Sequence, residues 1–355
     1  MTAQPDNIAD LQEAVCTHER LRIRGRGTKS SPEAERERVT LDISGLTGII
    51  EYSPEECVFT AWAGTPLADI TALLAQQGQY LPFDPPLLEA GATIGGTVAA
   101  GLSGSERYRY GGVRDFIIGV RIVDGEGRLI RSGGKVVKNA AGFLLHHGMV
   151  GSLGRFGVLA ELTFKVFPAP ESRATLRVRC ESLPYAVDTL HAIERTRCDV
   201  AALDFDDSGT LWIRVAGSRA ALATRVDKLQ RAVPFAVDRL GDVEDEQFWT
   251  DAREFRWATG AALVKIPGPR LSDWAGSADW GTLRDSLTAA RFACGGSVAW
   301  VAVDDPAAFS TRLAAAGLSG LVVRGAMAGA RIGLTPSNSF EEHVRSVLDP
   351  RRRFS

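Results

Sequence analysis

Glycine is concentrated in one short part of this chain. Of the 37 glycines, 17 lie between Gly91 and Gly157, a stretch that is less than a fifth of the 355 residues. Glycine loses more conformational entropy on folding than other residues, so such a concentration is favourable mainly where turns need positive φ or where backbone closely approaches a ligand. We therefore expect a fold in which bare backbone forms a binding surface.

Tryptophan is distributed in the opposite way. Only Trp62 precedes residue 170, whereas six tryptophans follow it. The two compositional halves meet near Phe167–Glu171, where two prolines end a strand and cannot continue a central ladder. We predict two domains, residues 1–168 and residues 169–355.

The overall composition excludes several classes of protein. Lysine and arginine (41) nearly balance aspartate and glutamate (43), so no net field attracts nucleic acid or an anionic membrane. The five scattered cysteines lack the spacing of a zinc site, an iron-sulfur site or a disulfide framework. No apolar run reaches the length of a membrane span, and the first ten residues lack the pattern of an export signal. We expect a cytoplasmic chain with no metal site, no nucleic-acid partner and no membrane span.

The periodicity of apolar residues predicts an α+β fold. In the first half, Leu21 and Ile23 predict a strand that enters a Gly-rich turn, and Thr65 is expected to cap a helix that ends at Gly78. In the second half, the pattern over residues 176–233 predicts the order β-α-β-β-α, and further strands are expected beyond residue 260. This order is typical of a ferredoxin-like, largely antiparallel sheet covered by helices.

The first Gly-rich segment, RGRGTKS at residues 24–30, follows the predicted strand directly. It presents consecutive backbone amides, a hydroxyl group and cationic side chains, which together can bind the oxygens of a diphosphate. It matches neither the Rossmann pattern nor the Walker pattern. The alternative interpretation is a basic surface turn.

Two further segments carry little side-chain bulk. Residues 90–101 read AGATIGGTVAAG, which allows backbone to pack against a flat ring system or a diphosphate. Close helix packing through small residues is the alternative. Residues 150–161 again place glycines three apart before a predicted strand.

Taken in order, these segments resemble the vanillyl-alcohol oxidase and p-cresol methylhydroxylase type of FAD-binding proteins. TIGGTVAAGLSG at residues 93–104, VRD at 113–115 and GGKVVKNAAG at 133–142 resemble in particular the FAD-binding E subunits of bacterial glycolate oxidases. The resemblance covers about residues 20–170. It implies a p-cresol methylhydroxylase-type FAD-binding domain with two subdomains, followed by a C-terminal cap domain that helps to bind the substrate.

The resemblance also implies where FAD binds. Residues 24–30 and 90–112 contain no histidine or cysteine, the residue types that hold the flavin covalently in some relatives, so we expect non-covalent FAD. The expected cofactor-binding residues are Gly25, Arg26, Gly27, Thr28, Lys29, Pro82, Asp84, Pro85, Gly91, Thr93, Ile94, Gly95, Gly96, Ala99, Ala100, Gly101, Gly112, Arg114, Gly154, Gly157, Val158 and Leu159.

The implied activity is the oxidation of glycolate, or of a similar small 2-hydroxy acid, to the 2-oxo acid. This reaction needs a cation that holds the substrate carboxylate and a base that takes the hydroxyl proton. Arg109, Tyr110 and Lys265 are our candidates for catalytic residues, and plain surface charge is the alternative for them. The chain lacks clustered cysteines, so the resemblance implies a separate iron-sulfur subunit and a larger flavin subunit, with any membrane association through these partners.

The chain departs from the family pattern in two places. Phe143 and Leu144 replace a usual Tyr-Asp pair, and the final residues DPRRRFS stand where relatives continue through an Asn-Pro-Gly-Arg-like tail. The adjacent His146 and His147 are expected to be a structural or solvated pair. Two alternatives therefore stay open: a free-standing flavin oxidase or dehydrogenase, and a catalytically silent scaffold subunit with a flavin fold.

Overall fold

The computed structural model describes residues 1–29, 38–134, 144–268, 278–327, 329–335 and 339–354. The predicted nest residue Ser30 and most of the GGKVVKNAAG motif, with Phe143, lie outside these residues. The chain forms two compact units. Unit 1 comprises residues 1–103, 111–169 and 336–355, and unit 2 comprises residues 104–110 and 170–335.

A single cut near residue 168 is therefore too simple a description of the domains. The main change of unit lies at Ala169 and Pro170, next to the prolines that suggested it. However, the short segment 104–110 belongs to unit 2, and the C-terminal segment 336–355 belongs to unit 1. Both exceptions depend on buried contacts between residues that are far apart in the sequence, which composition does not reveal.

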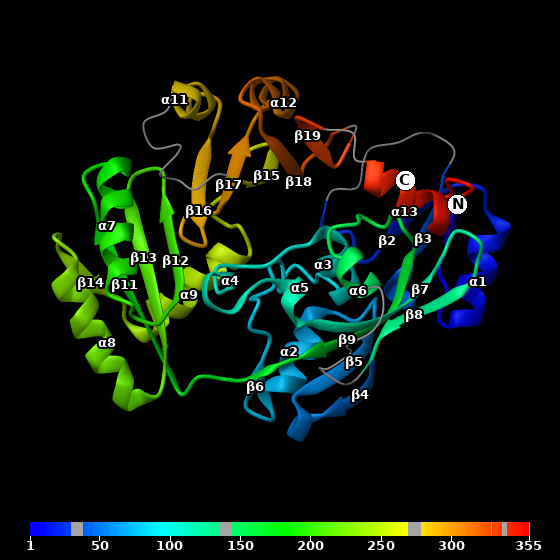
Figure 1. Ribbon diagram of the computed structural model, residues 1–355, viewed down its shortest axis with the longest axis horizontal. Helices are drawn as coiled ribbons and strands as arrows, with labels where there is room; N and C mark the ends of the chain where they lie inside the picture. The colour runs from blue at the N-terminus through cyan, green and yellow to red at the C-terminus, as the bar shows by residue number, and fades with distance from the viewer. Residues whose placement is uncertain (30–37, 135–143, 269–277, 328, 336–338, 355) are drawn as a thin grey trace. The chain divides into compact units, whose positions relative to one another are not determined.

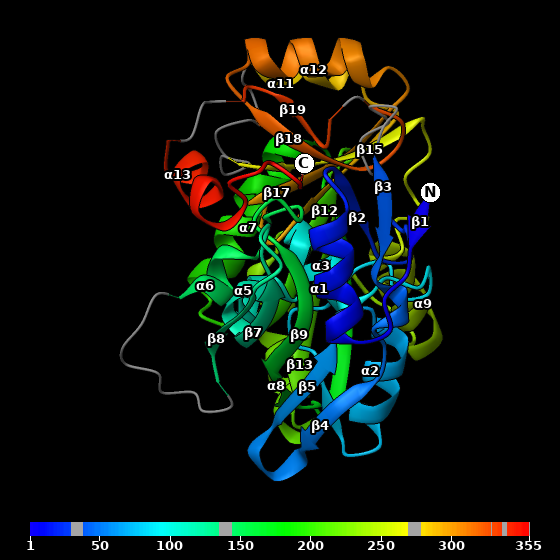
Figure 2. The same ribbon diagram turned by 90° about the vertical axis from the view of Figure 1, so that its right-hand side faces the viewer.

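Unit 1 contains two main sheets, which correspond to the two subdomains expected (Figures 1 and 2). The first sheet is parallel, in the order β1-β3-β2, with strands Thr2–Ala3, Val39–Asp42 and Leu21–Arg24. The second sheet is antiparallel, in the order β4-β5-β9-β7-β8, with strands Ile49–Ser53, Val58–Trp62, Val158–Lys165, Ile117–Val123 and Leu129–Gly133.

Short helices and strands complete unit 1. They are α1 (Ile8–Thr17), η1 (Ile43–Gly45), η2 (Pro54–Glu56), α2 (Leu67–Ala75), β6 (Gln79–Tyr80), α3 (Ile94–Ala100), α5 (Val113–Phe116), α6 (Leu145–Gly148), β10 (Phe167–Pro168) and α13 (Ser339–Leu348). Phe59, Phe83, Phe116 and Phe164 stack in a chain of ring contacts with centroids 5.7–5.9 Å apart, so the core of this unit is largely aromatic at its centre.

Helix α2 shows how local sequence sets an element. Its apolar residues Leu67, Ile70 and Leu74 recur at helical spacing and are completely buried. The predicted N-cap was wrong by one residue: Pro66 is the N-cap, and it makes no side-chain capping bond. The Thr65 hydroxyl instead donates a hydrogen bond to the backbone oxygen of Trp62, because the chain turns sharply there between β5 and α2.

Unit 2 is built on one nine-stranded sheet in which every strand pair is antiparallel, in the order β14-β11-β13-β12-β16-β17-β15-β18-β19. The strands are β11 (Ser172–Arg179), β12 (Val200–Asp206), β13 (Thr210–Gly217), β14 (Val237–Arg239), β15 (Ala262–Pro267), β16 (Ala289–Ala293), β17 (Val298–Val303), β18 (Ser319–Arg324) and β19 (Arg331–Gly333). The helices are α4 (Arg107–Tyr110), α7 (Leu183–Arg195), α8 (Arg219–Ala232), α9 (Asp242–Arg253), α11 (Ala278–Arg284) and α12 (Pro306–Ala315).

The sheet of unit 2 contains the ferredoxin-like order twice. The elements β11-α7-β12-β13-α8-β14 form a first β-α-β-β-α-β unit, and β15-α11-β16-β17-α12-β18 form a second. In each unit the fourth strand lies beside the first, and the third lies between the first and the second. The second strands of the two units, β12 and β16, pair at Phe205 and Phe292, whose rings stack 5.0 Å apart. This central pairing joins both repeats into one core.

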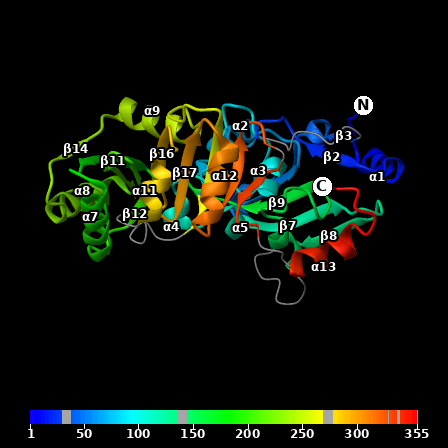
Figure 3. The same cartoon turned by 90° about the horizontal axis from the view of Figure 1, so that it is seen from above.

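The two faces of the unit 2 sheet differ. Leu176, Val178 and Ile213 belong to the main core together with residues of α7 and α8. Successive side chains alternate along a strand, so Trp212 lies on the opposite face, where its ring stacks 4.6 Å from that of Phe248 on α9. Figure 3 shows α7 and α8 on one side of the strands and α9 on the other.

Within the described residues, no helix combines the length and the apolar character that crossing a bilayer requires.

Candidate functional site

A pocket in unit 1 is formed where the three glycine segments meet. Its lining comes from β2 and the turn that follows, from η1, from the residue after β5, from the start of α3 and from the loop that leads into β9. The lining residues are Ile23, Gly25, Ile43, Ala63, Thr93, Gly95, Gly96, Ala99, Leu153, Gly154, Gly157 and Leu159. The expected contacts Gly25, Thr93, Gly95, Gly96, Ala99, Gly154, Gly157 and Leu159 are all among them.

The glycines of this pocket leave no space for a side chain. A Cβ atom on Gly25 would lie 2.7 Å from the Oγ1 atom of Thr93, and one on Gly154 would lie 3.1 Å from the Cδ1 atom of Ile23. Gly154 also has a φ of +79°, which few residues other than glycine adopt. The walls of the pocket are therefore made of closely packed backbone, as the glycine concentration predicted.

Gly95 agrees with the alternative interpretation, close packing of small residues. A Cβ atom there would lie 2.7 Å from both the Cβ atom and the backbone oxygen of Ala63. Its N–H donates to that oxygen at 2.8 Å, and the N–H of Gly96 donates to Oγ1 of the N-cap residue Thr93 at 3.1 Å. The first amides of α3 thus have protein acceptors, and the donors for an anionic ligand must come from another segment.

The turn after β2 offers such donors. Among the residues that the structure describes, the backbone N–H groups of Arg26, Gly27, Thr28 and Lys29 donate no hydrogen bond to a protein acceptor. The Nζ atom of Lys29 donates to Oγ1 of Thr28 at 3.3 Å, and it lies 3.8 Å from the Cβ position of Gly96. Successive amides beside an ammonium group form an anion-binding nest. The residues present therefore fit the diphosphate of FAD.

Desolvation changes the acidity of Lys29. Burial of its ammonium group lowers the pKa of Lys29 to about 8, although part of the side chain remains accessible. A buried cation is stabilised by an anion placed beside it. A diphosphate in the turn would thus restore the pKa of Lys29 toward its ordinary value.

The other expected cofactor residues do not line the pocket. Gly91, with φ +87°, adjoins the turn, since its Cβ position lies 3.9 Å from Cδ of Arg26. Gly112 caps α5 and donates to Asp115, and Arg114 is exposed on the same helix. The expected residues outside the lining are Arg26, Gly27, Thr28, Lys29, Pro82, Asp84, Pro85, Gly91, Ile94, Ala100, Gly101, Gly112, Arg114 and Val158.

Four lining residues are not among those expected from the sequence: Ile23, Ile43, Ala63 and Leu153. Ile23 is the last inward-facing position before the glycine turn, so its alternation with Leu21 was a usable signal. Ala63 and Ile43 carry no comparable signal, because only the packing of η1 and β5 against α3 brings them to the pocket.

The three candidates for catalytic residues all lie in unit 2. The Nη2 atom of Arg109 is 3.2 Å from Oδ2 of Asp199, and its guanidinium lies 5.3 Å from the ring of Tyr110. This arrangement favours the surface-charge interpretation for both residues. Lys265 on β15 is different: it is 8 % exposed, and its Nζ atom lies 5.8 Å from the ring of Trp300. Burial, with a smaller contribution from the nearby Arg107, lowers the pKa of Lys265 to about 8.

His146 and His147 pack against each other with ring centroids 4.4 Å apart. His146 is buried, its Nδ1 atom is 3.4 Å from Oγ of Ser132, and burial lowers the pKa of both histidines. These are the contacts of a packed structural pair. In the described part of the chain, no three histidine, cysteine, aspartate or glutamate side chains are grouped as metal ligands.

Comparison with known proteins gives a consistent result. Residues 1–133 match the family described as FAD binding domain. The chain is 35 % identical over 288 residues to glycolate oxidase subunit GlcE of Escherichia coli (strain K12), which covers 77 % of this chain and 79 % of that protein. It is 32 % identical over 168 residues to glycolate oxidase subunit GlcD of Bacillus subtilis (strain 168), covering 47 % of this chain and 36 % of that longer protein.

Two further similarities concern an enzyme and a fold. A D-lactate dehydrogenase of Anaerostipes hadrus is 32 % identical over 167 residues, 47 % of this chain and 35 % of that protein. The solved structure of an alkyldihydroxyacetonephosphate synthase superposes with a TM-score of 0.71 at 14 % identity, covering 99 % of this chain and 75 % of that one. The predicted α+β fold, with a p-cresol methylhydroxylase-type FAD-binding domain and an antiparallel cap, is confirmed.

Proposed function

We propose a function from one premise: this chain belongs to the family of the glycolate oxidase subunit GlcE. The family predicted from the glycine segments is thereby confirmed, and the cofactor is FAD. The pocket lining contains neither histidine nor cysteine, which supports non-covalent binding.

The chain is an FAD-dependent oxidoreductase subunit that acts on the CH–OH group of a 2-hydroxy acid, and glycolate, oxidised to glyoxylate, is the substrate we propose. The observation that carries this proposal is the glycine-lined pocket beside the amides of residues 26–29. When bound, FAD supplies the acceptor for the hydride that leaves C2 of the hydroxy acid.

Each part of the pocket contributes one function. The amides of residues 26–29 and the Lys29 ammonium hold the diphosphate. The bare backbone of Gly95 and Gly154 keeps the walls free of side chains. Ile23, Ile43, Leu153 and Leu159 provide apolar surface that excludes water from the bound cofactor.

For the substrate, we propose that Lys265 binds the carboxylate group. It is a buried cation, and an anion beside it offsets the cost of its desolvation. Arg109 and Tyr110 remain weaker candidates for the same role, because Arg109 is paired with the exposed Asp199 and lies over the ring of Tyr110.

A pH profile tests the role of Lys265. The second-order rate of flavin reduction by glycolate reports the protonation state of the free enzyme. Lys265 carries its charge below pH 8 and loses it above, so this rate is expected to fall up to about tenfold per pH unit above 8. The Lys265→Arg variant keeps its positive charge, so its rate of flavin reduction is expected to show no such fall. In the Lys265→Met variant, glycolate is expected to reduce the flavin slowly at every pH. The same fall in the Lys265→Arg variant would contradict the assignment.

We also propose that the chain works with partner subunits that remove the electrons, namely a larger flavin subunit and an iron-sulfur subunit. The relative GlcE is named as a subunit. The five cysteines of this chain are in no disulfide and are scattered along the sequence, which does not suit an iron-sulfur site. A reducing, cytoplasmic location suits these thiols, and any membrane association would depend on the partners.

The visible absorption spectrum of the purified protein tests the proposal as a whole. A released yellow chromophore that is FAD, and that is bleached by anaerobic glycolate or D-lactate, would support it. A colourless protein that takes up no added FAD would contradict it and favour a silent scaffold. Flavin that binds but is not reduced would assign the chemistry to a partner subunit. Sustained turnover by this chain alone, with dioxygen or a quinone, would favour a free-standing enzyme.

A further inference from the structure

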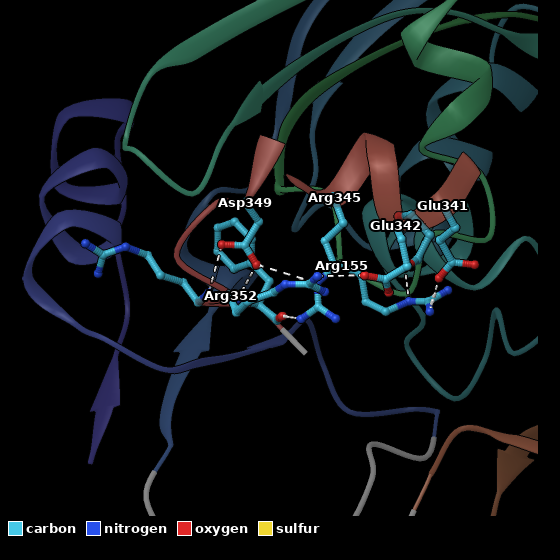
Figure 4. Close-up of polar contacts among 9 residues, drawn as sticks. Arg155, Glu341, Glu342, Arg345, Asp349 and Arg352 are labelled. Atoms are coloured by element: carbon cyan, nitrogen blue, oxygen red, sulfur yellow. Dashed lines mark hydrogen bonds and ion pairs between the residues drawn. The ribbon is translucent and has the colours of Figure 1, made fainter. Parts of the chain in front are cut away.

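The C-terminal segment, residues 339–354, belongs to unit 1 and contacts the strand and the loop that carry the two walls of the pocket. Figure 4 shows residues of this segment together with Arg155 of the loop. It consists of α13 and the tail of residues 349–354. We propose that this segment is a clamp that positions the two pocket loops for FAD. The inference rests on the proposed FAD site, and Arg155 and Glu341 act in it as positioning residues.

The tail reaches the first wall at the start of β2. Phe354 is completely buried and forms a parallel bridge with Leu21, and the N–H of Leu21 donates to the backbone oxygen of Arg353 at 2.8 Å. The Arg353 guanidinium donates to the backbone oxygen of His18. Because β2 is an edge strand of its sheet and leads through Ile23 into the glycine turn, the tail fixes the strand that carries the first wall.

Asp349 holds the tail in this position. It is completely buried, its Oδ1 accepts from the N–H of Arg353 at 2.8 Å, and its Oδ2 accepts from the N–H of Phe354 at 3.0 Å. The N–H of Gly125 donates to the backbone oxygen of Leu348 at 2.7 Å. A Cβ atom on Gly125 would lie 2.5 Å from Asp349, so the tail packs directly on the β7–β8 turn.

Helix α13 reaches the second wall through an ion pair between Glu341 and Arg155. The two side chains are 15 % and 21 % exposed, so the pair is mostly shielded from water. Arg155 lies between the pocket residues Gly154 and Gly157, and its Nε atom donates to the backbone oxygen of Ser152 at 3.2 Å. The carboxylate of Glu341 is thus attached to the loop that forms this wall.

This loop needs support because its backbone conformation is unusual. Leu153 has a φ of +54°, and Gly151, Gly154 and Gly157 also have positive φ values. A non-glycine residue in the left-handed region is strained and persists where surrounding contacts hold it. Gly154 packs against Ile23, so the loop and strand β2 contact each other at the pocket. A segment that holds both of them therefore sets the distance between the two walls.

Glu342 provides a matched control. It is the next residue on α13, and its Oε2 atom pairs at 2.6 Å with Arg352, which lies within the C-terminal segment itself. Both of these side chains are about half exposed. Glu341→Gln therefore removes the ion pair with the pocket loop. Glu342→Gln removes an ion pair within the C-terminal segment and, with it, only a weaker charge interaction with Arg155.

The experiment removes the flavin from the full chain and titrates it back into the parent protein and into both variants. Glu341→Gln is expected to raise the Kd for FAD about tenfold, and Glu342→Gln to change it less than twofold. Amide hydrogen exchange without FAD gives a second readout: residues 151–157 are expected to exchange faster in Glu341→Gln only.

A charge-reversed pair separates positioning from general stability. Arg155→Glu alone is expected to weaken FAD binding, and Arg155→Glu with Glu341→Arg is expected to recover most of the affinity. If the Glu341→Gln variant does not fold, the FAD affinity of the double variant tests the clamp instead. A parent protein that takes up no FAD would contradict the proposed function. A parent that binds FAD together with a Glu341→Gln variant of equal affinity, or a double variant without recovery, would overturn the clamp.

Discussion

At the scale of single residues, Gly25 shows how closely the cofactor turn packs on α3. A Cβ atom at this position would lie 2.7 Å from the hydroxyl oxygen of Thr93, which caps α3. We expect Gly25→Ala to displace the turn or the cap and to weaken FAD binding by about tenfold or more. Gly148→Ala is the matched control, since no atom lies within 4 Å of its Cβ position. Equal FAD affinity in both variants, measured by titration of the apoprotein, would contradict the assignment of this wall.

We expect Lys29 to make FAD binding depend on pH. Its pKa is about 8 without an anion, and a bound diphosphate would raise that pKa. The contribution of the Lys29 ammonium to the free energy of FAD binding is then fully present below pH 8. It is lost as the pH rises through the higher pKa of Lys29 in the complex. We expect the affinity for FAD to fall by up to about tenfold per pH unit above 8. Lys29→Gln should bind more weakly below pH 8 and show no such slope; a parallel slope in this variant would place the titrating group elsewhere.

At the scale of elements, the short segment 104–110 is held in unit 2 by buried polar contacts. Asp204 on β12 is 1 % exposed and accepts from the Ser105 hydroxyl at 2.5 Å and from Nε of Arg291 at 3.2 Å. Glu106, in the same segment, lies 3.6 Å from Arg214 on β13. These contacts explain why a segment from the glycine-rich half belongs to the second unit.

Removal of the Asp204 carboxylate should therefore destabilise unit 2. Asp204→Ala leaves the guanidinium of Arg291, 8 % exposed, without its carboxylate, and breaking a buried pair in this way costs about 3–5 kcal/mol of unfolding free energy. Asp199→Ala is the control, because that carboxylate is 54 % exposed and its ion pairs contribute under about 1 kcal/mol. Urea unfolding of both variants measures the difference. If Asp204→Ala loses as little unfolding free energy as Asp199→Ala, the buried network is not important for stability.

At the scale of the whole molecule, the two units can be followed separately. Six of the seven tryptophans belong to unit 2 by their position in the chain, whereas the pocket proposed for FAD belongs to unit 1. We expect FAD at about one hundred times its Kd to raise the unfolding free energy of unit 1 by about 2.7 kcal/mol. The unfolding transition that tryptophan fluorescence reports should occur at the same denaturant concentration with and without FAD. A single transition that FAD shifts as a whole would show that the units unfold together.

The sequence by itself determined the family, the α+β fold class, the β-α-β-β-α order after residue 170 and the glycines of the pocket. These features depend on local requirements: a turn that needs Gly154 at positive φ, or apolar residues that alternate along a strand, can be recognised without knowing distant neighbours. Only the tertiary structure decided that Ala63 packs against Gly95, that segment 104–110 belongs to unit 2, and that residues 339–354 contact Leu21 and Arg155 beside the proposed FAD pocket. These contacts join residues far apart in the chain, and their geometry is set by packing and not by local composition.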